Sequence, residues 1–139
     1  MGKFDWFWKA MGSSSERNDK KSKGIVSHAH GLIADYEQRS DAELVEAVRE
    51  TVADGQIKKK PEFLAVLTVA SARTLGMTPF EVQNQAVLRL LEGDVIQMAT
   101  GEGKTLVGAM AATGFALTGK RVHLITVNDL SLIHISEPT

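Results

Sequence analysis

The sequence predicts an α/β fold in which a helical N-terminal arm leads into the first part of a parallel sheet. Helix-like spacing of apolar residues within residues 25–75 predicts the arm. The parallel sheet is predicted by two short apolar runs, at 94–98 and 121–127, which enclose a glycine-rich turn and an alanine-rich helix. A strand, a glycine-rich turn, a helix and a second strand in this order form a βαβ unit.

Composition limits the class of protein. A chain of 139 residues and 15.1 kDa with 43% hydrophobic residues can bury one core of single-domain size. Its 16 basic and 17 acidic residues nearly cancel, so no overall field favours a nucleic-acid partner. The absence of cysteine excludes disulfides and thiolate metal sites and favours a reducing compartment. The apolar runs are shorter than the roughly 20 residues that span a bilayer, and the first residues make a poor signal peptide.

The first residues predict a short amphipathic helix. Phe4, Phe7, Trp8 and Met11 have the spacing of one helical face. Two interpretations stay open, a peripheral anchor in a membrane interface or a terminal helix packed on its own domain. The polar stretch 12–24, flanked by glycine and serine, is expected to be a linker.

The arm should contain three helices, and a fourth should follow it. The first runs from Ile25 to about residue 36, and the second opens at Ser40, where Glu43 has capping-box spacing. The turn at 54–56 stops the second helix, and Gly76 ends the third. The fourth is expected to use Thr78 as its N-cap, with proline at its first position, and to close at residue 93.

The glycine-rich turn "MATGEGKT" suits a phosphate. It follows the pattern G-x-x-x-x-G-K-[ST], except that Met98 replaces the first glycine. Gly101 and Gly103 let backbone N–H groups face inward as an anion nest at a helix N-terminus. Lys104 adds a positive charge for the β and γ phosphates, and the Thr105 hydroxyl is a ligand for Mg²⁺. A turn that merely caps a helix is the alternative, and the flanking strand and helix make it less favoured.

An adenine site is predicted about 20 residues upstream of this turn. Phe80 and Gln83 are three residues apart on the fourth predicted helix and should therefore share a face. A glutamine amide can both donate to and accept from the adenine edge, and Phe80 supplies an aromatic wall. The pair favours ATP over GTP.

Three stretches resemble, in order, motifs of the SecA family, the motor ATPases of bacterial preprotein translocation. They are "GMTPFEVQ" at 76–83, "QMATGEGKT" at 97–105 and "VHLITVND" at 122–129. Met98 is also the residue that this family has. The resemblance runs from about residue 13 to 129 and is closer to the accessory actinobacterial paralogue. A superfamily 2 helicase is the alternative with the same fold, but no basic, aromatic-laced RNA platform is visible.

The resemblance implies a RecA-like, P-loop NTPase domain that uses ATP and Mg²⁺ to push preproteins through a SecYEG-type channel. It implies a cytoplasmic protein, peripheral at the inner face of the cell membrane, with possible contact to anionic lipid and no nucleic acid. The implied nucleotide-binding residues are Gly76, Met77, Phe80, Gln83, Thr100, Gly101, Glu102, Gly103, Lys104 and Thr105. Lys104 and Thr105 are the implied catalytic residues, and Thr105 is the implied metal ligand.

Four segments are expected. They are an amphipathic helix and linker at 1–24, the arm at 25–75, the start of the first nucleotide-binding domain at 76–129, and a non-native tail at 130–139. The tail back-translates into a string that resembles a transposon adapter used for sequencing libraries, so it is excluded from the fold prediction. The acidic Walker B strand and the arginines that hydrolysis requires would lie beyond 129. The fragment alone is therefore expected to be inactive.

Overall fold

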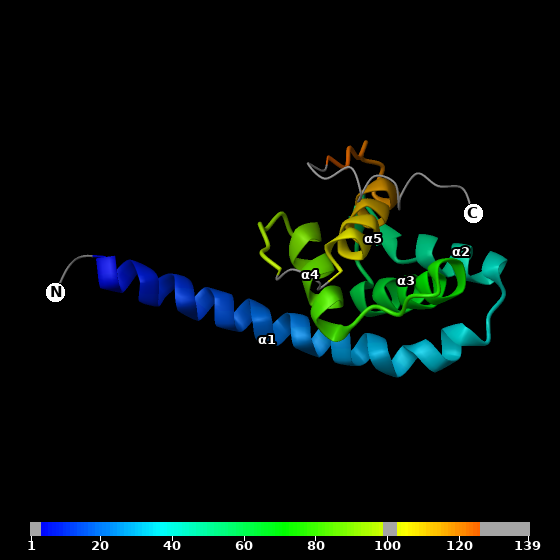
Figure 1. Ribbon diagram of the computed structural model, residues 1–139, viewed down its shortest axis with the longest axis horizontal. Helices are drawn as coiled ribbons and strands as arrows, with labels where there is room; N and C mark the ends of the chain where they lie inside the picture. Colours follow the sequence, from blue (N-terminus) through cyan, green and yellow to red (C-terminus); the bar gives the residue numbers. More distant parts are fainter. Residues whose placement is uncertain (1–3, 99–102, 126–139) are drawn as a thin grey trace.

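A computed structural model of the chain describes the backbone of residues 4–98 and 103–125, with side chains described from residue 17 onward (Figure 1). The described elements are α1 (Phe4–Glu37), α2 (Asp41–Arg49), β1 (Val52–Ala53), β2 (Gln56–Ile57), α3 (Lys60–Leu75), α4 (Glu81–Leu91) and α5 (Lys104–Leu117). Helices α1 and α2 pack on α3, and α4 packs on α1 and α5.

Helix α1 is continuous over 34 residues, so the linker predicted at 12–24 is wrong. Glutamate, arginine and lysine in this stretch favour a helix. Lys23 and Asp19, four residues apart, also form an ion pair of 3.0 Å on its surface. Residues 17–21 are exposed, and burial begins at Ser22. The first part of α1 accordingly extends beyond the body of the molecule (Figure 1).

The core is built around α3. Phe63, Leu64 and Ala65 are fully buried, and Val66 is nearly so, which means that every side of this helix turn is covered. Gly114 of α5 lies against the same region, and a Cβ there would come within 2.6 Å of Leu91 Cδ2 and 3.0 Å of Phe63 Cζ. The close approach of α5 to α3 and α4 therefore requires glycine at this position.

The capping box at the start of α2 is confirmed. The Ser40 hydroxyl accepts the Glu43 N–H at 3.3 Å, and a Glu43 carboxylate oxygen accepts the Ser40 N–H at 2.7 Å. The backbone hydrogen bond from Ser40 holds the pKa of Glu43 below its ordinary value. These paired bonds fix the direction in which the chain enters α2.

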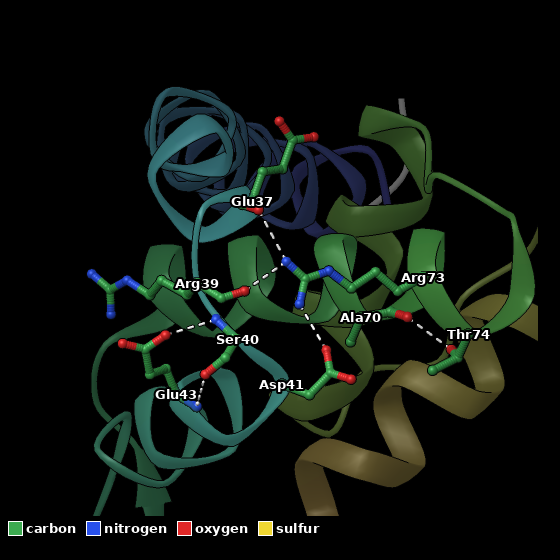
Figure 2. A network of polar contacts seen from close by, with 8 residues as sticks. All are labelled: Glu37, Arg39, Ser40, Asp41, Glu43, Ala70, Arg73 and Thr74. Atoms are coloured by element: carbon green, nitrogen blue, oxygen red, sulfur yellow. Dashed lines mark hydrogen bonds and ion pairs between the residues drawn. The ribbon is translucent and has the colours of Figure 1, made fainter.

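Arg73 of α3 holds the turn between α1 and α2 together (Figure 2). One guanidinium nitrogen donates to the carbonyl oxygens of Glu37 at 3.0 Å and Arg39 at 2.7 Å. The other nitrogen donates to an Asp41 carboxylate oxygen at 2.7 Å. The side chain thus satisfies carbonyls at the end of α1 and a carboxylate at the start of α2.

A β-hairpin between α2 and α3 was not predicted from the sequence. β1 and β2 are antiparallel, and Val52 pairs with Ile57. Asp54 and Gly55 between them have φ values of 53° and 67°, as a two-residue hairpin turn requires. The Asp-Gly pair is itself a strong hairpin signal.

The predicted start of the fourth helix is wrong by two residues. The N-cap of α4 is Phe80, with φ −74° and ψ 160°, rather than Thr78. The N–H of Phe80 donates to the Gln83 side-chain oxygen at 2.7 Å. Gln83 therefore supplies the side-chain bond at this helix start from its third position, so a capping hydroxyl at Thr78 is not needed.

The helix predicted after the glycine-rich turn is confirmed as α5, but the predicted strands on either side are not seen. Residues 94–98 and 121–125 belong to no helix or strand, and 126–127 lie outside the described residues. A strand requires a hydrogen-bonded neighbour, and Val95 and Ile125 are 99% and 88% exposed. The parallel sheet is thus not shown, and the β1–β2 hairpin is the strand pairing of the described residues.

None of the helices in residues 4–98 and 103–125 is both long and apolar enough to cross a membrane.

We expect Arg73→Ala to lower the free energy of unfolding by about 1–3 kcal/mol, because two carbonyls and a carboxylate lose their shared donor. Urea unfolding followed by circular dichroism measures the loss. Arg49→Ala is the matched control, since Arg49 makes one exposed ion pair of 2.9 Å with Glu46. It should cost no more than about 0.5 kcal/mol. Equal losses for the two variants would contradict the role of Arg73.

Candidate functional site

The turn from α3 to α4 positions the first part of the site. Gly76 ends α3 in the left-handed region, with φ 65°, and its N–H donates to the Ala72 carbonyl at 3.1 Å. The Ser71 hydroxyl donates to the Met77 carbonyl at 2.7 Å. These two bonds tie both ends of the turn back to α3, so the chain reaches Phe80 along a fixed path.

Phe80 and Gln83 lie in different environments, so the prediction that they share a helical face is wrong. Phe80 precedes the helix in an extended conformation, and its residue surface is 72% exposed. Gln83 lies inside α4 and is only 4% exposed. The two are nevertheless joined by the hydrogen bond from the Phe80 N–H to Gln83. An exposed aromatic ring thus stands next to a buried amide.

Gln83 also reaches the glycine-rich turn. Its side-chain nitrogen donates to the Gly103 carbonyl at 3.4 Å, across 20 residues of sequence. The contact lies where α4 packs against α5. The structure therefore brings Gln83, together with its bonded partner Phe80, to the residue that precedes α5.

Gly103 is required at this point for two reasons. It is the N-cap of α5 and has φ 73° and ψ 46°, in the left-handed region that L side chains rarely adopt. A Cβ at this position would also overlap the side-chain nitrogen of Gln83. The close approach of Gln83 therefore depends on the absence of a side chain at 103.

Lys104 and Thr105 form the first turn of α5, and both are exposed. The first N–H groups of a helix have no acceptor within it, and the helix dipole favours negative charge there. With an exposed ammonium and hydroxyl beside these groups, the start of α5 is suited to an anion such as phosphate. Thr100, Gly101 and Glu102, which were predicted to complete the site, lie outside the described residues.

Within the part of the chain that the structure describes, no group of three or more histidine and acidic side chains could hold a metal ion. The exposed Thr105 hydroxyl remains the candidate ligand for Mg²⁺ carried by a nucleotide.

Sequence reasoning missed two polar residues near the site. Ser71 is buried on α3, and its hydroxyl holds the Met77 carbonyl. Asn84 follows Gln83 on α4 and is 6% exposed, and its side-chain oxygen has no hydrogen-bond partner among the described residues. A polar residue on an otherwise apolar helix face was the available signal, because buried polar groups are normally bonded.

Residues 7–131 match the model of the SecA DEAD-like domain. The chain belongs to the SecA family. The match supports the SecA interpretation, and it implies a RecA-like fold for the domain.

The most similar relatives include accessory SecA proteins. The chain is 55% identical to protein translocase subunit SecA 2 of Corynebacterium glutamicum strain R, over 99% of this chain and 18% of that protein. It is 56% identical to SecA 2 of Corynebacterium efficiens, with the same coverage of both chains. SecA 3 of Mycolicibacterium vanbaalenii is 46% identical over 88% of this chain and 16% of that protein. The expected similarity to an accessory SecA is confirmed, and the chain spans less than a fifth of these relatives.

Proposed function

We propose that the chain forms the first part of the nucleotide-binding domain of a SecA motor, which hydrolyses ATP with Mg²⁺ and moves preproteins through a SecYEG-type channel. The contact between Gln83 and Gly103 is the observation that carries the proposal. It brings Gln83, with Phe80 bonded to it, from the motif at 76–83 to the start of α5, where we propose that phosphate binds. Membership of the SecA family supports the same function.

In this proposal the phosphates bind at the start of α5. Lys104 would meet the β and γ phosphates as a point charge, and the first N–H groups of α5 would donate to them. The Thr105 hydroxyl would hold Mg²⁺, and the ion would supply positive charge that offsets the charge of the phosphate oxygens. The exposure of both side chains leaves them accessible to the nucleotide.

The base binds beside Phe80 and Gln83, with Gly76 and Met77 in the adjoining turn. The Phe80 ring is exposed and offers an aromatic surface to adenine. The Gln83 amide reads the adenine edge while it also contacts Phe80 and Gly103.

Hydrolysis also needs an acidic residue that holds Mg²⁺ and arginines that stabilise the transition state. We assign these groups to parts of the motor outside residues 1–129. The alternative function for the isolated chain is a weak nucleotide-binding module that releases no phosphate. For the complete motor we propose a cytoplasmic location, peripheral at the inner face of the membrane.

Lys104→Ala in the complete motor should lower ATP turnover by about 100-fold or more, because the charge that meets the β and γ phosphates is lost. Steady-state phosphate release measures this. Lys21→Ala is the control, since Lys21 is an exposed lysine on α1. Unchanged turnover in Lys104→Ala would refute the role of this residue.

Gln83→Ala should reduce discrimination between ATP and GTP more than it reduces phosphate affinity, since only the base edge distinguishes the two nucleotides. Competition of ATP and GTP against a fluorescent ADP analogue measures the ratio of their dissociation constants. Asn84→Ala, at the adjacent buried position, controls for general loosening of α4. An equal loss of affinity for both nucleotides in Gln83→Ala would argue against adenine reading.

We further propose that the first part of α1 contacts anionic membrane. Phe4, Phe7, Trp8 and Met11 have the spacing of one apolar helix face, and α1 extends beyond the body of the molecule (Figure 1). Arg17, Lys20, Lys21 and Lys23 follow on the same helix. Basic residues near an anionic surface each contribute about 1 kcal/mol, reduced by salt. Apolar burial and charge therefore favour the same surface.

The chain has two tryptophans, Trp6 and Trp8, so its tryptophan fluorescence reports directly on this segment. Vesicles containing phosphatidylglycerol should shift the emission to the blue, and added salt should reverse the shift. The double variant Phe4→Ser and Phe7→Ser, which keeps both tryptophans and every charge, should show a much smaller shift. No shift with either anionic or neutral vesicles would leave the helix start as a packing element.

A further inference from the structure

Ser71 uses its hydroxyl differently from the other two hydroxyl residues of α3. Thr68 donates to the carbonyl of Leu64, four residues earlier, at 2.8 Å, and Thr74 makes the same kind of bond at 2.7 Å. Serine and threonine within helices commonly bond back in this way. The Ser71 hydroxyl instead donates forward to the Met77 carbonyl at 2.7 Å, beyond the end of the helix. It therefore holds the turn that follows α3 rather than α3 itself.

The turn at 77–79 has few other attachments. Within the described part of the chain, these three residues make no backbone–backbone hydrogen bond. Pro79 is buried but has no N–H to donate. Met77 and Phe80 are exposed, so their side chains bury little apolar surface against the body. The path of the turn therefore depends on the bond from Ser71 and on the buried proline.

This turn leads directly into the proposed base site. Gly76 and Met77 belong to that site, and Phe80 presents its exposed ring three residues after Met77. The N–H of Phe80 is held by the Gln83 side chain. The stretch from Met77 to Phe80 is thus fixed at both ends by a side chain, by Ser71 at its start and by Gln83 at its end. Ser71 is only 6% exposed and acts through the Met77 backbone.

We infer that Ser71 is a positioning residue for the adenine base. This role rests on the proposed nucleotide site. By holding the Met77 carbonyl, Ser71 limits where the Phe80 ring can stand before the base binds, which lowers the ordering cost of binding. The phosphate end of the site lies on another element, since Lys104 and Thr105 are at the start of α5. Loss of the Ser71 hydroxyl should therefore weaken ligands that carry a base and spare ligands that carry phosphates alone.

The test compares Ser71→Ala with Thr68→Val in the complete motor. Each change removes one buried α3 hydroxyl that donates to a carbonyl, and the bond lost reaches the turn only in Ser71→Ala. Calorimetric titration with Mg²⁺ and either ADP or inorganic tripolyphosphate measures the two affinities. Ser71→Ala should weaken ADP by about three- to tenfold, the worth of one hydrogen bond, and leave tripolyphosphate within about twofold. Thr68→Val should leave both within about twofold.

ATP turnover supplies a second readout. Ser71→Ala should raise the KM for ATP by about the same factor and leave kcat within about twofold, because the groups that meet the phosphates are unchanged. A variant that had lost the fold of the site would lose tripolyphosphate binding and kcat as well. Equal weakening of both ligands by Ser71→Ala, equal weakening of ADP by Ser71→Ala and Thr68→Val, or unchanged ADP affinity in Ser71→Ala would each overturn the inference.

Lys104→Ala separates these results from failure of the nucleotide site itself. It should weaken both ADP and tripolyphosphate, because both carry phosphates that the ammonium would meet. With that loss present, the behaviour of Ser71→Ala decides its role alone. If Lys104→Ala left both ligands bound as before, the proposed site and the role of Ser71 would both be wrong.

Discussion

Complete burial of the α3 turn from Phe63 to Val66 is the constraint on which the rest of the structure depends. Four consecutive residues, from Phe63 to Val66, are buried, so no side of the helix can face water there. Such a helix is stable only when neighbours cover it all round. α1 and α2 supply cover along its length, and Gly114 lets α5 approach the ring of Phe63. The helix ends at Gly76, so the same packing also fixes where the turn toward the nucleotide site begins.

After the turn at Gly76, a few hydrogen bonds position the residues of the candidate nucleotide site. Ser71 and Gly76 set the path to Phe80, and Gln83 joins the start of α4 to Gly103. Each bond involves at least one backbone group, so the geometry depends on chain direction as much as on side-chain identity. Gly103 is where these requirements meet, because the backbone there must adopt a left-handed conformation and accept a close neighbour.

Local chemistry explains which features were predictable. The Ser40 capping box and the end of α3 at Gly76 depend on residues close together in sequence, and both predictions are confirmed. Motif order gave the family correctly, and it placed α5 directly after the glycine-rich turn. The hydrogen bond from Gln83 to Gly103 joins the two parts of the predicted site. Residues 100–102, which were also predicted to belong to it, lie outside the described residues.

The failures have a shared physical cause in non-local or competing interactions. The clamp by Arg73 joins residues more than 30 positions apart, which spacing rules cannot detect. Glycine and serine suggested a linker at 12–24, but the charged residues among them sustain a helix. The start of α4 at Phe80 was not predicted, because the Phe80 N–H is bonded by the side chain of Gln83, three residues later in the sequence. Predicted strands at 94–98 and 121–125 have no ladder partner among the described residues.

The unbroken course of α1 has a mechanical consequence. At 1.5 Å per residue, its 34 residues form a rod about 50 Å long. Its later turns pack on α3 and α4, so a tilt imposed at the free tip is transferred to those helices, whereas a linker would absorb it. The rod is thus a lever, with one end extending beyond the body of the molecule and the other against the helices that carry Gly76 and Gln83.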